Sequence, residues 1–190
     1  GQQILGFETT GKGEYLFGFE ESYGCLIGTY ARDKDAIVAT MALCEAAAYY
    51  KTQGKTLWDA MIEMYEQFGY YKDAIQSVTM KGIEGLQKIQ EIMNSLRQNP
   101  PTEFAGHKVV AVRDYKADTI KDLATGEVKA TGLPNSNVLY YELTDDAWVC
   151  VRPSGTEPKI KIYYTTLGKD LAEAEAEKEK LAKALEPMMA

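Results

Sequence analysis

Residues Ala147–Thr165 read AWVCVRPSGTEPKIKIYYT, and this stretch is the part of the sequence that tells most about the fold. Its two arms, Ala147–Val151 and Lys159–Thr165, are rich in β-branched and aromatic residues, so both are expected to be strands. Between them lies a short polar loop whose ends are stiffened by Pro153 and Pro158. The stretch therefore predicts a strand, a conformationally restricted loop and a second strand.

The loop Arg152–Lys159 contains the groups that bind phosphate. It brings together a guanidinium fork, the hydroxyls of Ser154 and Thr156, a glycine and several backbone N–H groups. Bidentate donors, hydroxyl donors and a nest of backbone N–H groups are what a phosphate group requires. The alternative is a polar connecting loop whose serine and threonine bond their own backbone, and composition alone does not separate the two.

The sequence around this hairpin predicts an antiparallel sheet with helices on one face. Apolar periodicity and turn residues predict strands at Ala74–Met80, Lys108–Asp114 and Asn137–Leu143, and helices at Gly82–Arg97 and Lys169–Met189. The region around Thr125-Gly126 is interpreted as a turn between two of the strands. The order β-α-β-β-β-β-α, with short connections, is typical of an α+β domain rather than a parallel sheet.

The first third of the chain has a different character. A short aromatic strand at Glu14–Phe19 is followed by a helix that begins near Asp35, with Asp33 or Asp35 as its cap and Gly54 beyond its end. A second helix opens with the capping-box pattern Thr56-x-x-Asp59 and runs to Gly69. Because the pattern changes just after this glycine, we place a domain boundary near Tyr71.

The polar triplet Glu20-Glu21-Ser22 lies among glycines and is the second candidate site. Successive side chains of an extended segment point to opposite faces, so Glu20 and Glu21 do not form an acid/base pair. Glu20 and Ser22 share one side, where a carboxylate and a hydroxyl are suited to hydrogen bonds with sugar hydroxyls. The alternative is an exposed surface turn without a ligand.

Composition excludes several classes of function. The chain has 21 Lys and Arg against 28 Asp and Glu, a net charge of −7, so generic binding to DNA, other nucleic acids or anionic membranes is not expected. Three cysteines without a C-x-x-C pattern, and no apolar leader or membrane span, favour a reducing, cytoplasmic location. The lone histidine, His107, is expected to be a solvated edge residue rather than a general base.

The segment Gly18-Phe19-Glu20-Glu21-Ser22-Tyr23-Gly24 and the loop Arg152–Lys159 together resemble the α-D-phosphohexomutase family, and in particular its bacterial phosphoglucomutase/phosphomannomutase branch. The loop motif is specific, with eight residues in an expected strand–loop–strand context, and the order and separation of the two motifs agree with the family. The usual sugar loop reads G-E-E-S-G, and here Phe19 and Tyr23 replace the flanking glycines.

The resemblance implies a mixed α+β chain taken from a longer protein. Residues 1–71 would be the C-terminal half of an α/β phosphohexomutase domain 3, which carries the sugar-binding loop. Residues 72–190 would be domain 4, a small antiparallel-sheet domain with helices packed on it, which carries the phosphate-binding loop. The partners implied are a small-molecule phosphosugar and the remaining N-terminal domains of the same protein.

The resemblance also implies which residues contact substrate. Glu20 and Ser22 would hold sugar hydroxyls. The phosphate that is not being transferred would be bound by Arg152, Ser154, Gly155, Thr156 and, at the edge of the site, Lys159. No T-A-S-H-N-P-like or D-G-D-x-D-R-like stretch is present, so no catalytic residue and no metal ligand is expected in this chain.

The activity implied is the interconversion of hexose 1-phosphate and hexose 6-phosphate through a phosphoserine and a bisphosphate intermediate, and glucose is the sugar expected from the branch that the chain resembles. Mg²⁺ would be bound by the missing part of the protein, hexose 1,6-bisphosphate would act as activator, and this chain alone would be inactive. The alternatives are phosphomannose or phosphoglucosamine specificity, as in phosphoglucosamine mutase, and a non-catalytic phospho-ligand binding module.

Overall fold

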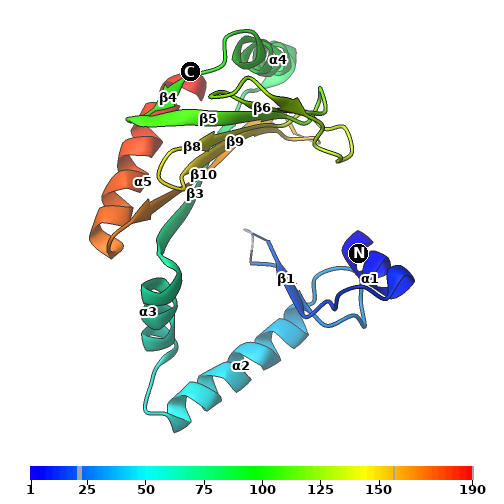
Figure 1. Cartoon of the computed structure of the whole chain (residues 1–190), viewed down its shortest axis with the longest axis vertical. Coiled ribbons are helices and arrows are strands. Elements are labelled where there is room, and N and C mark those ends of the chain that lie inside the picture. The colour runs from blue at the N-terminus through cyan, green and yellow to red at the C-terminus, as the bar shows by residue number, and fades with distance from the viewer. Residues whose placement is uncertain (21–22, 156, 190) are drawn as a thin grey trace. The chain divides into compact units, whose positions relative to one another are not determined.

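A computed structural model of the chain describes residues 1–20, 23–155 and 157–189 and divides into two compact units, Gly1–Met64 and Tyr65–Ala190 (Figure 1). The division lies within helix α3 (Leu57–Phe68), a little before the boundary predicted near Tyr71. The sheet of the second unit begins at Tyr70. The exact domain boundary remains a prediction.

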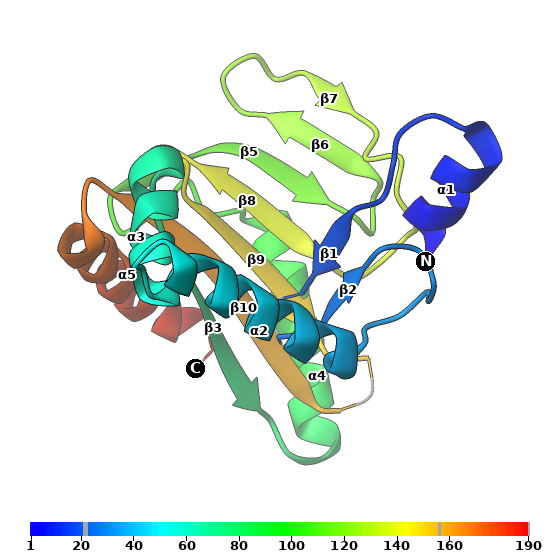
Figure 2. The same ribbon diagram turned by 90° about the horizontal axis from the view of Figure 1, so that it is seen from below.

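The second unit is built on one antiparallel sheet. Its strands, in chain order, are β3 (Tyr70–Thr79), β4 (Glu103–Phe104), β5 (His107–Asp114), β6 (Thr119–Asp122), β7 (Val128–Lys129), β8 (Leu139–Leu143), β9 (Trp148–Pro153) and β10 (Lys159–Gly168). Within the described residues their order across the sheet is β3-β10-β9-β8-β5-β6-β7, with β4 paired to β5 (Figure 2). All of these pairs are antiparallel, which confirms the predicted fold class.

Helices α4 (Gly82–Gln98) and α5 (Leu171–Leu185) pack on one face of this sheet, and the short 3-10 helix η1 (Glu186–Met189) follows α5. The strand residues that point toward the helices alternate with those that do not, as a sheet covered on one side requires. The central core residues, all buried, are Met93, Tyr141, Val149, Val151, Ile160, Ile162 and Leu181. The opposite face of the sheet carries the alternate residues of these strands, among them Tyr140, Arg152 and Tyr163.

The first unit contains α1 (Gln2–Thr10), a hairpin of β1 (Phe17–Phe19) and β2 (Cys25–Ile27), α2 (Ala36–Thr52) and most of α3. Of the two predicted caps of α2, Asp35 is the one used: its Oδ1 accepts hydrogen bonds from the backbone N–H groups of Ile37 and Val38 at 2.9 and 3.1 Å. The capping box of α3 is confirmed by reciprocal bonds between Thr56 and Asp59.

The apolar side chains of α2 and α3 are not covered by the residues that the structure describes. Ile37 is 76% exposed and Trp58 is 60% exposed, and no residue of either helix is buried. A helix with such side chains normally buries them against another layer. The first unit therefore presents apolar surface that a further layer of protein would stabilise.

Two features of the second unit differ from the prediction. The turn predicted around Thr125-Gly126 is present, and it joins two short paired strands, β6 and β7, that were not predicted. Strand β3 begins at Tyr70 rather than Ala74, because its polar first residues pair with the long strand β10. None of the helices that the structure describes combines the length and apolar character needed to cross a membrane.

Candidate functional site

The loop between β9 and β10 is closed at its base by backbone hydrogen bonds. The N–H of Ser154 donates to the carbonyl of Lys159 at 2.8 Å, and the N–H of Met80 donates to the carbonyl of Pro158 at 2.8 Å. The Oγ of Ser154 accepts a weaker bond from the N–H of Glu157 at 3.3 Å. The loop is thus anchored on both sides while Gly155 at its tip stays exposed. Thr156, the remaining predicted hydroxyl, lies outside the described residues.

Arg152 lies where β9 enters the loop, and its side chain is exposed. Its neighbour Val151 is fully buried among the helices, so alternation along the strand turns Arg152 toward the helix-free face. There it lines a hollow of about 510 Å³ together with Cys150 and the rings of Tyr140 and Tyr163. A guanidinium at the rim of an aromatic hollow suits a ligand that has an anionic end and a less polar body.

Lys159 lies at the other end of the loop, and its charge is already partnered. Its Nζ is 3.1 Å from the Oε2 of Glu157, and its side chain is 26% exposed. Such a pair near the surface is worth little and is readily exchanged for a more strongly charged ligand. Lys159 would have to release Glu157 before it could bind a phosphate at the edge of the site. This role of Lys159 stays a prediction.

Cys150 faces the same hollow as Arg152 and is a neutral thiol. Burial raises the pKa of the Cys150 thiol to about 11, and the Arg152 guanidinium lowers it only in part. A thiol is nucleophilic as its thiolate, so a raised pKa removes Cys150 as a candidate nucleophile at neutral pH. The Cys150 thiol therefore gives the hollow no activated nucleophile at neutral pH.

The Cys150 thiol is expected to react with iodoacetamide at pH 8 about 100-fold more slowly than a thiol of ordinary pKa. Its rate should rise as the pH approaches about 11, because only then does the thiolate accumulate. Mass spectrometry of the alkylated peptides measures this, with the exposed Cys44 of α2 as the internal reference. Alkylation of Cys150 as fast as Cys44 at pH 8 would contradict the assignment.

Glu20 lies at the tip of the β1–β2 hairpin, where its backbone N–H donates to the carbonyl of Gly24 at 2.9 Å. Its carboxylate Oε2 is 3.7 Å from the Nζ of Lys34, and both side chains line a hollow of about 260 Å³. A Cβ on Gly24 would lie 2.7 Å from the Glu20 carboxylate and 2.2 Å from the Lys34 side chain, so a larger residue there would require these two flexible side chains to shift. Ser22 and Glu21 lie outside the described residues.

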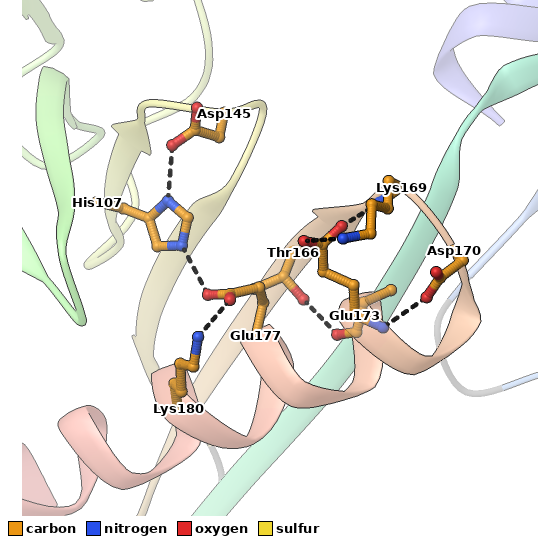
Figure 3. A network of polar contacts seen from close by, with 9 residues as sticks. His107, Asp145, Thr166, Lys169, Asp170, Glu173, Glu177 and Lys180 are labelled. Atoms are coloured by element: carbon orange, nitrogen blue, oxygen red, sulfur yellow. Dashed lines mark hydrogen bonds and ion pairs between the residues drawn. The ribbon is translucent and has the colours of Figure 1, made fainter.

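A second polar cluster, at the far end of the sheet unit, joins β5 to α5 (Figure 3). His107 Nδ1 is 3.1 Å from Asp145 Oδ2 and its Nε2 is 3.6 Å from Glu177 Oε2, and the His107 side chain is only 11% exposed. The expectation of a solvated edge histidine is therefore wrong, because two carboxylates from distant parts of the chain enclose the ring. Glu177 is paired in turn with Lys180.

The contacts of this cluster link β5 and the turn before β9 to helix α5. Within the described ranges, no three histidine, cysteine or carboxylate side chains come together in a way that could hold a metal ion. The first turn of α5 is closed beside it: Glu173 N–H donates to Asp170 Oδ1 and Lys169 N–H donates to Glu173 Oε2, each at 2.8 Å (Figure 3). These contacts are those of a capped helix packed on a sheet.

Sequence reasoning missed three side chains beside the predicted sites. Lys34 contacts Glu20, Tyr163 lines the hollow with Arg152, and Lys161 is the cross-strand partner of Arg152. For Tyr163 and Lys161 a signal was present, because Ile160 and Ile162 mark the buried face of β10 and leave the alternate residues on the face of Arg152. For Lys34, no local sequence pattern predicts its contact with Glu20.

Two family models match the chain. Residues 6–68 match the phosphoglucomutase/phosphomannomutase alpha/beta/alpha domain III, and residues 92–184 match the phosphoglucomutase/phosphomannomutase C-terminal domain. The two models follow each other in the order that the sequence motifs predicted and together span most of the chain. The chain belongs to the phosphohexomutase family. The chain matches the C-terminal portion of a protein of this family.

Curated relatives within the phosphohexomutase family agree with this. A phosphoglucomutase of Staphylococcus aureus strain bovine RF122 / ET3-1 is 42% identical over 148 residues, which are 78% of this chain and 27% of the relative. The phosphoglucomutase of strain MRSA252 is 41% identical over 148 residues, with the same coverage. The chain thus spans about a quarter of the length of the curated relatives that it matches.

A solved structure shows the same fold. The pp63/parafusin phosphoglucomutase from Paramecium, in its open form, superposes with a TM-score of 0.62 at 22% identity, covering 99% of this chain and 32% of that protein. At this level of identity the likeness concerns the fold alone. The fold of this phosphohexomutase portion, a mixed α+β chain with an antiparallel C-terminal sheet, is therefore the one expected from the sequence.

Proposed function

We propose that this chain is the substrate-binding C-terminal part of a phosphohexomutase that interconverts hexose 1-phosphate and hexose 6-phosphate through a phosphoserine and a bisphosphate intermediate. The observation that carries the proposal is the position of Arg152, exposed at the rim of the aromatic hollow beside an anchored loop. Arg152, Ser154, Gly155, Thr156 and Lys159 would bind the phosphate that is not transferred. Glu20 and Ser22 would bind sugar hydroxyls.

The division of labour is physically reasonable for phosphoryl transfer. This reaction depends mainly on positioning and on stabilising charge, so tight binding of the remote phosphate helps to hold the reacting end in line. The Glu20 carboxylate would serve to bind sugar hydroxyls, and the Arg152–Lys159 loop would serve to bind the phosphate. Glucose is the sugar we favour, since the matched relatives are phosphoglucomutases; mannose and glucosamine phosphates are the alternatives.

We assign the nucleophilic serine and the Mg²⁺ site to the remaining N-terminal domains of the same protein. In support, the sequence has no T-A-S-H-N-P-like stretch and no D-G-D-x-D-R-like stretch. Mg²⁺, when bound there, would supply charge stabilisation at the transferred phosphoryl group, and hexose 1,6-bisphosphate would be the activator. The apolar surface left on α2 and α3 is consistent with a larger α/β domain around them. The three free thiols support our proposal of a cytoplasmic location.

Titration of the ¹⁵N-labelled chain with glucose 6-phosphate tests the binding role. The amides of Gly155 and Arg152 are expected to shift in a saturable way, because the phosphate contacts the loop. Glucose at the same concentrations is the matched control and should leave these amides unchanged, since it lacks the phosphate. Equal shifts with glucose, or no shifts with glucose 6-phosphate, would contradict the proposed phosphate site.

The chain alone is expected to show no mutase turnover. A coupled assay with glucose 1-phosphate, glucose 1,6-bisphosphate and Mg²⁺ should give the rate of the protein-free blank, because the residues assigned to the chemistry belong to other domains. An intact phosphoglucomutase added to the same mixture serves as the positive control. Turnover by the purified chain, proportional to its concentration, would overturn the proposed division between binding and chemistry.

A further inference from the structure

A largely buried arginine of helix α4 joins two segments of the chain beside the hollow at Arg152. Arg97 donates from Nε to Asp114 Oδ2 at 2.9 Å and from Nη2 to Asn137 Oδ1 at 2.7 Å. The side chains of Arg97 and Asp114 are only 17% and 16% exposed. We call Arg97, Asp114 and Asn137 the clamp. None of the three lines the hollow itself.

The segments that the clamp joins form one wall of the hollow. Of residues 133–138, which we call the wall segment, all but Asn137 line the hollow, and so does Tyr115 at the end of β5. The N–H of Tyr115 donates to the carbonyl of Val138 at 3.1 Å, and the N–H of Ser136 donates to the carbonyl of Tyr115 at 3.3 Å. The wall segment and the end of β5 are therefore bonded to each other along their length.

Alternation at the start of β8 explains how the clamp reaches the wall segment from the helix side. Leu139 is buried against the helices, and Asn137, two residues earlier, points the same way and contacts α4. Val138 and Tyr140 point the other way and line the hollow. The clamp thus holds the wall segment from behind, outside the space that a ligand would occupy.

The clamp fixes geometry more than it adds stability. A largely buried charge pair contributes little net free energy, because the cost of removing both charges from water offsets most of their attraction. The planar guanidinium of Arg97 nevertheless donates in fixed directions. Both oxygens of Asp114 are used, since Oδ1 accepts from the N–H of Lys116 at 3.0 Å. These contacts favour one arrangement of the wall segment over a range of arrangements.

We propose that Arg97 and Asn137 are positioning residues, which fix the wall segment so that it can contact the sugar part of a phosphosugar bound at Arg152. This inference rests on the proposed function and adds to it two residues outside both loop motifs. The hollow of about 510 Å³ is of the size of small-molecule sites, and a phosphate group alone would fill a small part of it. The wall segment and the rings of Tyr140 and Tyr163 are left to contact the body of the ligand.

Titration of the ¹⁵N-labelled chain with glucose 6-phosphate and, separately, with inorganic phosphate tests the clamp in Asn137→Ala. This change removes one acceptor and leaves the ion pair of Arg97 and Asp114 in place. We expect the wall segment to keep its binding arrangement only about a third to a tenth of the time, so the dissociation constant for glucose 6-phosphate should rise about three- to tenfold. Inorganic phosphate would contact only the Arg152–Lys159 loop, so its dissociation constant should change by less than about twofold.

Three further variants complete the titrations. Asn137→Asp should restore most of the affinity, because a carboxylate oxygen also accepts from a guanidinium. Asn94→Ala makes the same change as Asn137→Ala at an exposed position of α4 and should leave both dissociation constants unchanged. Pro134→Gly loosens the wall segment at an exposed position without touching the clamp, so it should reproduce the selective loss even if Asn137→Ala is poorly folded.

Amide hydrogen exchange supplies a readout that a general loss of stability would not produce. In Asn137→Ala, the amides of Tyr115 and Ser136 should exchange faster than in wild type, since their bonds join the wall segment to the end of β5. The amide of Met80, which anchors the Arg152–Lys159 loop, should keep its rate. Equal acceleration at all three amides would show that the clamp only stabilises the unit and would overturn its positioning role.

The outcomes separate this inference from the function on which it rests. If the wild-type chain shows no saturable response to either ligand, the proposed function fails and the role of the clamp fails with it. If wild type binds both ligands but Asn137→Ala weakens both equally, or neither, only the positioning role is overturned. A selective loss of affinity for glucose 6-phosphate, restored by Asn137→Asp, supports the clamp.

Discussion

Replacing Arg152 by alanine, in an intact enzyme that contains this chain, is expected to lower kcat/KM for a hexose phosphate by about 10- to 150-fold. A hydrogen bond to a charged group contributes roughly 1.5–3 kcal/mol net, and Arg152 is placed to donate such bonds at the rim of the hollow. Lysine at this position should rescue only part of the loss, because an ammonium keeps the charge but lacks the planar fork.

The fold should survive this substitution. Arg152 is exposed, and its side chain lies on the face of the sheet away from the core, so the melting temperature should stay close to that of the wild type. Lys121→Ala, which removes a charge from an exposed strand position, controls for the change in net charge. Normal kcat/KM with a lowered melting temperature would show that the loop is structural and that Arg152 does not bind substrate phosphate.

Replacing Gly85 by alanine is expected to destabilise the second unit, although the same change in an ordinary helix interior is favourable by about 1 kcal/mol. Gly85 is buried in the first turns of α4, and a Cβ there would lie 2.0 Å from the carbonyl oxygen of Met80. Because that atom belongs to the backbone, the helix or the end of β3 must move. We expect a loss of about 1–3 kcal/mol in the free energy of unfolding, measured by urea denaturation.

The effect should also reach the Arg152–Lys159 loop. The N–H of Met80 donates to the carbonyl of Pro158, so displacement of Met80 strains the anchor of the loop. Gly6→Ala is the matched control, since Gly6 is also helical but a Cβ there meets no heavy atom within 4 Å. A Gly85→Ala protein that is as stable as wild type, with an unchanged response to phosphate, would contradict this account of the packing.

The features predicted correctly depend on residues that are close in sequence. The cap at Asp35, the glycine at Gly54 with its positive φ of 72°, and the Thr56–Asp59 box all concern contacts within a few residues. Helix α4 and the strands on either side of the Arg152–Lys159 loop follow from apolar periodicity in the same way. Such features can be predicted from the sequence because the side chains of each short segment determine whether it forms a cap, a helix or a strand.

The errors have a common physical origin. Strands β6 and β7 were not predicted because they are short and contain few apolar residues, so they lack the apolar alternation from which strands are recognised. His107 is enclosed by Asp145 and Glu177, residues that are far from it in the chain. No short stretch of sequence predicts that β6 pairs with β7 or that two distant carboxylates enclose the His107 ring.

By itself, the sequence determined the mixed α+β class, the family and the loop whose groups suit a phosphate, because each depends on the types and order of neighbouring residues. Only the tertiary structure decided that Arg152 lies opposite Lys161 beside Tyr163, and that Met80 anchors the far end of the loop. The physical reason is that strand register and helix packing are set by contacts between distant segments. A shift of one residue in β10 would turn Lys161 into the core and Ile160 and Ile162 toward the helix-free face.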